Sequence, residues 1–298
     1  MATALAINDR AARPGIRDVI GLFKLRIGIL IMVTALVGLA VSPAPVPGFL
    51  EVVTVAFTVL MASASAGAFN QYYESDSDAM MARTSHRAFV TGTLVPKPSW
   101  LLLMGAMLAG SVALAAFVLN PVSALYVFLG AFFYAIVYTV WLKRRTWLNI
   151  VIGGLAGSFA VLAGAAAADP AIGAQPALLA VVLFLWTPPH FWSLAIAHQD
   201  DYVNARIPML PVLVGPARAA RIVFYNTAAL VAVSVLPVFY GAGPIYAIGA
   251  VAGGCYFLVK TRALARAPGQ DTARQAFLAS LVQLSVLLIA ASIDSMFW

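Results

Sequence analysis

Charged side chains are scarce in this chain of 298 residues. Asp, Glu, Lys and Arg make up only 10% of it, whereas hydrophobic residues make up 62%. Soluble domains carry about 25% charged residues, so this composition excludes an ordinary soluble protein and indicates a polytopic membrane protein. The single cysteine, Cys255, excludes an internal disulfide and a thiolate metal cage. No glycine-rich turn follows a strand-like segment, so the pattern of a nucleotide-binding loop is also missing.

The N-terminal region lacks the features of a cleavable signal peptide. Its first 26 residues carry five basic side chains but no apolar stretch that ends in a small-residue cleavage site. We therefore expect the first hydrophobic segment to remain as a helix, preceded by a cytoplasmic tail over residues 1–19.

Nine hydrophobic segments follow one another along the chain, each close to the ~20 residues that span a bilayer. They predict an all-α, polytopic membrane protein that forms a single membrane-embedded domain over residues 1–298. Pro188 and Pro189 predict a local break in the sixth segment, because proline removes a helical hydrogen bond. The segments centre on residues 20–43, 49–72, 98–119, 122–142, 147–167, 176–197, 219–240, 243–262 and 275–297.

Basic residues are confined to one side of the predicted membrane. All 18 Lys and Arg lie in the N-terminal region or after the second, fourth, sixth and eighth segments. The positive-inside rule makes that side cytoplasmic, with the N-terminus inside and the C-terminus outside a bacterial inner membrane. We attribute the net charge of +7 to this topology and to contact with the lipid bilayer, not to nucleic-acid binding.

The densest polar stretch of the chain covers residues 70–87. Glu74, Asp76 and Asp78 lie within five residues of one another. If the second helix continues through them, Asn70, Glu74 and Asp78 project from one face, about one turn apart, and Asp76 points elsewhere. Neighbouring carboxylates repel one another unless a cation lies between them, and Mg²⁺ is the usual solution.

A second acidic pair, Asp200 and Asp201, follows the sixth segment. Both acidic sets are predicted at cytoplasmic helix ends, where they could face each other and bind a diphosphate through Mg²⁺. Basic side chains could bind the remaining phosphate oxygens. The alternative is that both sets are solvated loop charges. The candidate phosphate-binding residues are Arg83, Arg87, Lys143, Arg144 and Arg145.

These residues resemble a known family. The pattern Asn70-x-x-x-Glu74-x-Asp76-x-Asp78, followed by Met81-x-Arg83-Thr84, resembles the first acidic motif of the UbiA-type intramembrane prenyltransferases. The stretches over residues 138–157, 186–197 and 200–212 resemble the heme-farnesylating branch of that family, the heme O synthases. The resemblance covers residues 22–213, and its one clear departure at the first motif is Glu74, where the family usually has Asp.

The resemblance implies a nine-helix bundle around a central cavity that opens laterally to lipid. It also implies farnesyl transfer from farnesyl diphosphate to a vinyl group of heme b with uptake of water, giving heme O and diphosphate, with Mg²⁺ as cofactor. Heme A synthase or a terminal oxidase assembly is implied as a partner. The implied catalytic and metal-binding residues are Asn70, Glu74, Asp78 and Asp201, supported by Asp76 and Asp200. The implied diphosphate-binding residues are Arg83, Arg87, Lys143 and Arg144.

The heme side of the expected reaction rests on His190, His198 and Trp186, which lie on or near the sixth segment. A histidine inside a membrane segment is a functional candidate by default. The alternatives are that each histidine only hydrogen-bonds a neighbouring helix, and that Trp186 belongs to the interfacial aromatic belt.

Two other functions stay open at this point. A transporter would also carry polar residues in its helices, but it would place charges near the membrane midplane and show an internal repeat. Within the enzyme class, the acceptor could be an aromatic quinone precursor or a chlorin instead of heme.

Overall fold

The protein is a helical bundle, seen here in a computed structural model that describes residues 15–43 and 48–297. Within these ranges every regular element is a helix, and eight helices are long and apolar enough to cross a membrane. A ninth span is the bent pair α1 and α2. The predicted all-α membrane fold is therefore confirmed, whereas most of the predicted tail lies outside the described residues.

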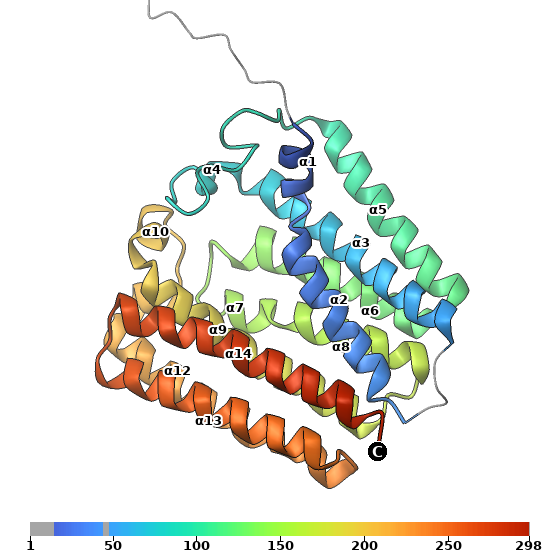
Figure 1. Ribbon diagram of the computed structural model, residues 1–298. Helices are drawn as coiled ribbons and strands as arrows, with labels where there is room; N and C mark the ends of the chain where they lie inside the picture. Colours follow the sequence, from blue (N-terminus) through green and yellow to red (C-terminus); the bar gives the residue numbers. More distant parts are fainter. Residues whose placement is uncertain (1–14, 44–47, 298) are drawn as a thin grey trace, which may run out of the picture.

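The helices follow the predicted segments closely (Figure 1). Their bounds are α1 Ile16–Leu22, α2 Leu25–Ala40, α3 Phe49–Tyr73, α4 Ser75–Asp78, α5 Pro98–Val118, α6 Pro121–Phe132, η1 Phe133–Leu142, α7 Asn149–Gly153, α8 Leu155–Ala168, α9 Ala174–Ala197, α10 Gln199–Asn204, α11 Leu210–Val214, α12 Pro216–Val235, η2 Leu236–Tyr240, α13 Pro244–Arg266 and α14 Gln270–Asp294.

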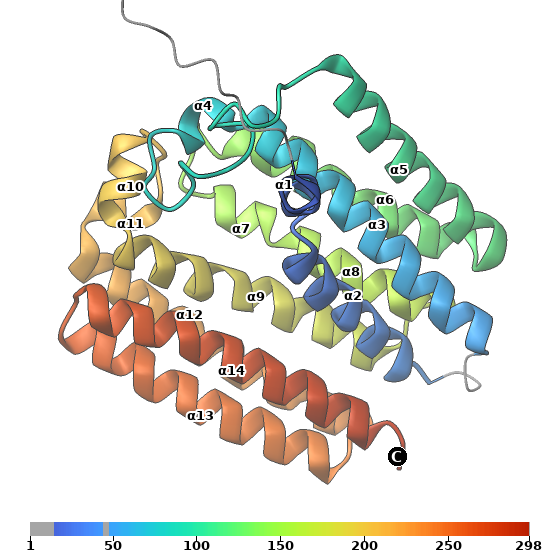
Figure 2. The same ribbon diagram turned by 45° about the horizontal axis from the view of Figure 1, so that its top comes forward.

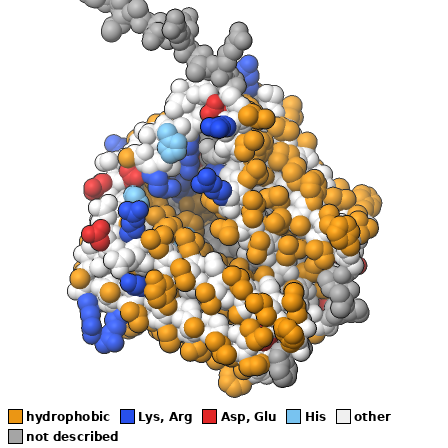
Figure 3. Space-filling view, viewed as in Figure 1, with side chains coloured by type: hydrophobic (Ala, Val, Ile, Leu, Met, Phe, Trp, Pro, Cys, Tyr) orange, Lys and Arg blue, Asp and Glu red, His pale blue; other side chains and the backbone are white. Residues whose placement is uncertain are grey.

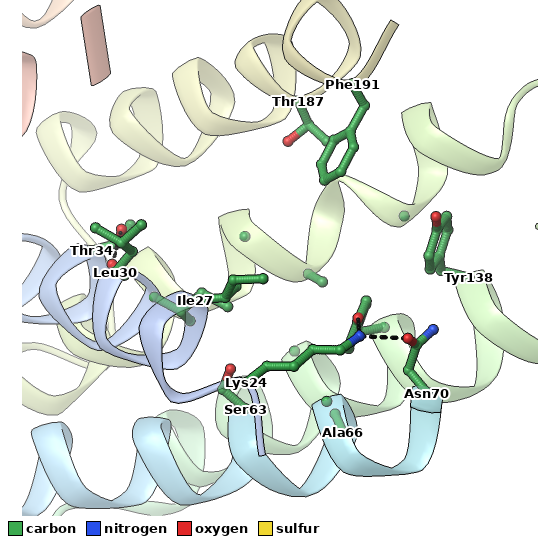
Figure 4. Close-up of a pocket in the computed structure, with 18 of the residues that line it drawn as sticks. Lys24, Ile27, Leu30, Thr34, Ser63, Ala66, Asn70, Tyr138, Thr187 and Phe191 are labelled. Atoms are coloured by element: carbon green, nitrogen blue, oxygen red, sulfur yellow. Dashed lines mark hydrogen bonds between the residues drawn. The ribbon is translucent and has the colours of Figure 1, made fainter. Parts of the chain in front are cut away.

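The first span is bent by 44° between α1 and α2. Lys24 lies at the bend with φ of 47°, in the left-handed region that side chains other than glycine rarely adopt. The hydrophobic pattern predicts one continuous segment here and gives no sign of the bend. Its consequence is that the Lys24 side chain points into the bundle instead of out of it (Figure 4).

The predicted break in the sixth segment is wrong. Helix α9 runs from Ala174 to Ala197 with Pro188 and Pro189 inside it. The two prolines remove the backbone donors to the Phe184 and Leu185 carbonyls. The neighbouring hydroxyls donate elsewhere in the helix, Thr187 to the Leu183 carbonyl at 3.0 Å and Ser193 to the Pro189 carbonyl at 2.6 Å. Because α9 also packs against α8, α12 and α14, tertiary contacts outweigh the local preference of proline.

Small residues fix how closely α2 and α8 approach. A Cβ on Gly38 would overlap the backbone of Val161, and one on Gly164 would overlap the backbone of Ala35. Only glycine permits this contact, which is the usual role of small residues between membrane helices. The close contact holds α2, and with it the bend at Lys24, in a fixed position over the centre of the bundle.

The helices surround a central space, with α12, α13 and α14 forming a layer on one side and α5 on the periphery of the other (Figures 1 and 2). Helices α4 and α10 lie at one end of the bundle, where the Ala82 amide just after α4 donates to Asp201 in α10. The polar stretch and the second acidic pair therefore belong to the same end of the molecule.

Candidate active site

A cavity of about 1250 Å³ occupies the centre of the bundle. Its polar lining gathers at the end that carries α4 and the end of η1, and the rest of its wall is mainly apolar. The space-filling view shows the hollow with Lys and Arg side chains around its rim (Figure 3). Small-molecule sites usually measure roughly 300–1,000 Å³, so this cavity is larger than a single small substrate needs.

The first acidic motif lies on this wall. Helix α3 ends at Tyr73, yet the Glu74 amide donates to the Asn70 carbonyl and the Asp78 amide donates to the Glu74 carbonyl, so helical spacing continues into α4. Asn70, Glu74 and Asp78 consequently share a face that lines the cavity, and they are 3%, 1% and 2% exposed. The Asp76 side chain is 64% exposed. The predicted alignment is present, with Asp76 on another side.

Each of the three buried side chains of this motif has a cationic partner, and the partners of Asn70 and Glu74 come from distant segments. Lys143 Nζ lies 2.5 Å from Glu74 Oε2, and the Arg87 guanidinium pairs with the Asp78 carboxylate. Lys24 Nζ donates to Asn70 Oδ1 at 2.6 Å (Figure 4). Buried charges are stable only when they are paired, so the cations and carboxylates form one mutually dependent cluster.

Lys24 is a site residue that the sequence analysis missed, since it was counted only among the basic residues that set the topology. It also donates to the Tyr134 hydroxyl at 3.2 Å. Tyr134 and Tyr138 stack on each other within the π-helix η1, with ring centres 5.9 Å apart, and both line the cavity. A lysine inside the apolar stretch GLFKLRIGIL was the available signal, because such a position is costly unless the charge has a buried partner.

Arg144 and Asp76 form a separate pair at the surface. The guanidinium donates to both carboxylate oxygens, at 2.9 and 2.6 Å. These hydrogen bonds lower the pKa of Asp76 and raise the pKa of Arg144. Arg144 and Arg145 are absent from the cavity wall, whereas the other predicted phosphate-binding residues, Arg83, Arg87 and Lys143, lie on it.

The second acidic pair does not face the first across the cavity. Asp201 Oδ1 accepts a hydrogen bond from the Ala82 amide at 3.0 Å, and Asp200 is exposed. The next residue, Tyr202, is buried on the cavity wall, and burial raises the pKa of its hydroxyl. Asp201 thus contacts the loop that carries Arg83 and Arg87, so the six predicted metal ligands lie in separate groups.

The first motif still suits Mg²⁺. Among the residues that the structure describes, no three Asp, Glu, His or Cys side chains converge into a protein-only metal cage. Magnesium seldom needs one, because it takes one or two carboxylates and completes its shell with phosphate and water oxygens. Asn70, Glu74 and Asp78 offer hard oxygen donors, and Glu74 Oε1 is enclosed without a hydrogen-bond partner. The residues present therefore fit the ion.

The structure brings two of the three heme candidates to the cavity. His190 and Trp186 line it, and their rings stack with centres 4.2 Å apart. Trp186 Nε1 donates to the Ser280 carbonyl at 2.9 Å, so its indole is anchored to α14. His198, at the end of α9, is half-buried and does not line the cavity.

A helical membrane bundle that encloses a large apolar cavity, with buried carboxylates and cations at one end, is the architecture of the intramembrane prenyltransferases. Residues 31–285 match the UbiA prenyltransferase family, and the chain belongs to that family. The solved structure of a digeranylgeranylglyceryl phosphate synthase superposes with a TM-score of 0.79 at 16% identity, covering 95% of this chain and 99% of the other. A UbiA homolog from Archaeoglobus fulgidus bound to DMAPP and Mg²⁺ gives 0.67 at 17% identity, covering 89% and 98%. At these identities the likeness shows the fold.

Similar proteins with curated names indicate which group of this family the chain resembles most. The chain is 55% identical to protoheme IX farnesyltransferase 2 of Paramagnetospirillum magneticum, over 91% of this chain and 94% of the relative. It is 45% identical to protoheme IX farnesyltransferase 1 of the same organism, over 93% and 98%. The enzyme of that name from Granulibacter bethesdensis is 37% identical over 93% and 90%. Family membership confirms the prenyltransferase prediction and removes the transporter alternative.

Proposed function

We propose that this protein transfers the farnesyl group of farnesyl diphosphate to a vinyl group of heme b, with uptake of water, and releases heme O and diphosphate. One observation carries the proposal: a buried cluster of carboxylates and cations lies at one end of a large apolar cavity, and the buried imidazole of His190 lies on the wall of the same cavity. The names of the curated relatives support heme as the acceptor.

The polar cluster would receive the diphosphate. Asn70, Glu74 and Asp78 would hold Mg²⁺, which when bound would neutralise the charge that develops on the leaving group. Lys143 and Arg87 already point at these carboxylates and lie on the cavity wall, so phosphate oxygens placed there would meet their N–H donors. This is catalysis by preorganised electrostatics, because the groups are in place before the carbon–oxygen bond breaks.

The apolar part of the cavity would take the farnesyl chain and the porphyrin. Breaking the C1–O bond of farnesyl diphosphate leaves an allylic cation, and the terminal carbon of the heme vinyl group forms the new bond to C1. Water then adds to the neighbouring vinyl carbon and loses a proton. The stacked rings of Tyr134 and Tyr138 lie beside the polar cluster, where their faces would stabilise the cation until the vinyl group reacts.

Asp201 would support the polar cluster through the backbone. By accepting from the Ala82 amide it holds the loop from which Arg83 and Arg87 reach the cavity. Asp76, Asp200 and Arg144 would act in outer, supporting positions, since the first two are exposed and the third lies off the cavity wall.

The proposed setting is a bacterial inner membrane, with the N-terminus and the polar cluster on the cytoplasmic side. The one-sided distribution of Lys and Arg supports this orientation. Heme A synthase or the assembly of a terminal oxidase would then use the product.

A heme-extract assay tests the function. Membranes bearing the protein are incubated with heme b, farnesyl diphosphate and Mg²⁺, and the extracted hemes are separated by chromatography. We expect heme O to appear only when all three are supplied. If a prenylated quinone precursor formed and heme O did not, the quinone alternative would replace this proposal.

A further inference from the structure

His190 has a hydrogen-bond arrangement that favours a proton on Nδ1. Ser280 has a single hydroxyl proton, which it donates to the Phe277 carbonyl at 2.6 Å. The Ser280 oxygen also lies 2.7 Å from His190 Nδ1, and while its proton is directed at the Phe277 carbonyl it accepts in that contact. This arrangement favours the tautomer that carries the proton on Nδ1 and leaves a free lone pair on Nε2.

That lone pair opens to the cavity. Nε2 has no hydrogen-bond partner among the described residues, and it is not one of the enclosed side-chain atoms that lack a partner. Since His190 is only 7% exposed and lines the cavity, the surface that remains to Nε2 is cavity surface. A buried nitrogen that keeps an unused lone pair toward an interior space points to a ligand.

The imidazole is held rigidly in this orientation. Trp186 stacks on one side with ring centres 4.2 Å apart, and the Phe277 ring lies tilted at 4.6 Å. Phe191 meets the ring edge-on at 4.9 Å. Together with the Ser280 hydrogen bond, these contacts leave little freedom to rotate, which is the property that a metal-binding imidazole requires.

The cavity wall leaves open space at Gly157. Gly157 lines the cavity, and a Cβ at its position would meet nothing within 4 Å. His190 lies seven residues before the end of α9, or about 10 Å along the helix axis, on the apolar side of the polar cluster. A porphyrin at this depth would keep its ring among apolar walls while one edge approaches the site of the leaving group.

Among the described residues, neither the other two histidines nor the cysteine shares the position of His190, whereas the Met81 thioether also lines the cavity. Of the three histidines, His86 is exposed in the loop at the cavity mouth and His198 is off the cavity wall. The single cysteine, Cys255, is exposed on α13.

We propose that His190 Nε2 is the axial ligand of the iron of the heme substrate, and that Ser280 is the positioning residue that keeps Nδ1 protonated. This inference rests on the proposed function and goes beyond it, since farnesyl transfer to a vinyl group does not itself require iron ligation. The role of the bond is to orient the porphyrin: it fixes the plane and the rotation of the ring, so that one vinyl group is presented to C1 of the farnesyl chain. A neutral imidazole whose Nδ1 proton is hydrogen-bonded is the usual heme ligand.

Resonance Raman and optical spectra of the purified full-length protein in lipid nanodiscs, titrated with heme b, test the ligand directly. The wild type is expected to show an iron–histidine stretch in the ferrous state. His190→Ala should lose it and regain a nitrogen-ligated spectrum on addition of imidazole, whereas His190→Cys should give a thiolate-type spectrum. The matched control, His198→Ala, should keep the wild-type signal. An iron–histidine stretch that persists in His190→Ala, or is missing in the wild type, overturns the proposal.

Ser280→Ala separates positioning from ligation. It removes the acceptor at Nδ1 without touching the iron, so we expect a shifted iron–histidine frequency and roughly 10–100-fold weaker heme binding. An unchanged frequency would contradict the positioning role. The heme-extract assay, run on the same wild-type preparation, distinguishes failure of the proposed function from failure of the ligation inference. Heme ligation without heme O formation would contradict the proposed function. Heme O formation without ligation by His190 would contradict only this inference.

Discussion

The two acidic sets of this protein differ in burial and in what they touch. Glu74 and Asp78 are 1% and 2% exposed, line the cavity and are paired with cations. Asp200 is exposed, and Asp201 holds the backbone of a loop. The first set can meet a substrate directly, while the second can act on it only through the loop. Both sets consist of carboxylates at the same end of the bundle, so the difference arises from the direction in which each helix end points.

The largest expected effect comes from breaking the buried set. Asp78→Asn removes a carboxylate from the polar cluster and leaves Arg87 without its counter-charge. We expect farnesyl transfer to fall by at least about a hundredfold, the scale of losing one preorganised electrostatic group. Heme binding, followed by the optical titration, should persist. Unchanged turnover would remove Asp78 from the catalytic cluster.

Lys24 tests the same difference, because it joins the α1–α2 bend to the buried carboxylates Glu74 and Asp78 through its hydrogen bond to Asn70. Lys24→Met keeps most of the side-chain volume but removes the charge near Asn70. We expect kcat/KM for farnesyl diphosphate to fall about 10–100-fold, equivalent to roughly 1.4–2.7 kcal/mol. The matched control is Arg26→Met, two residues away and exposed, which should change kcat/KM less than twofold. If kcat/KM fell equally in both variants, the effect of Lys24 would come from the net positive charge of the region and not from its contact with Asn70.

Substitutions in the second acidic set should lower activity less than those in the first, and Asp201 should matter more than Asp200. Asp201→Asn weakens the charge-assisted acceptor for the Ala82 amide, and a loss of about 1 kcal/mol would raise KM for farnesyl diphosphate roughly fivefold. Asp200→Asn, in which an exposed neighbour is changed, serves as the control and should match the wild type. The measurement is the dependence of initial rate on farnesyl diphosphate. If Asp201→Asn were as damaging as Asp78→Asn, the two sets would share one role.

The smallest effect is expected at the surface pair. Asp76→Asn breaks the bidentate contact with Arg144, but exposed ion pairs contribute about 0–1 kcal/mol because water screens them. We expect activity within about twofold of the wild type, and an apparent melting temperature that is lowered slightly at low salt and unchanged at high salt. A loss of activity that depends on Mg²⁺ concentration would instead place Asp76 with the buried set.

The sequence by itself determined the nine spans, the confinement of Lys and Arg to alternate connections, and the shared face of Asn70, Glu74 and Asp78. These features depend on helical period and composition, which are local properties of the chain. The family pattern likewise follows from residue spacing within short stretches, and so does the choice of His190 and Trp186 as heme candidates.

Tertiary structure decided the rest. The contacts of Lys24 with Asn70, Lys143 with Glu74 and His190 with Ser280 join residues 46, 69 and 90 positions apart, so no local pattern encodes them. Packing also overrode local preference at Pro188, where α9 continues, and at Lys24, where the span bends. A helix specifies which side chains share a face, but only the surrounding bundle determines whether that face meets a cavity, a loop or solvent.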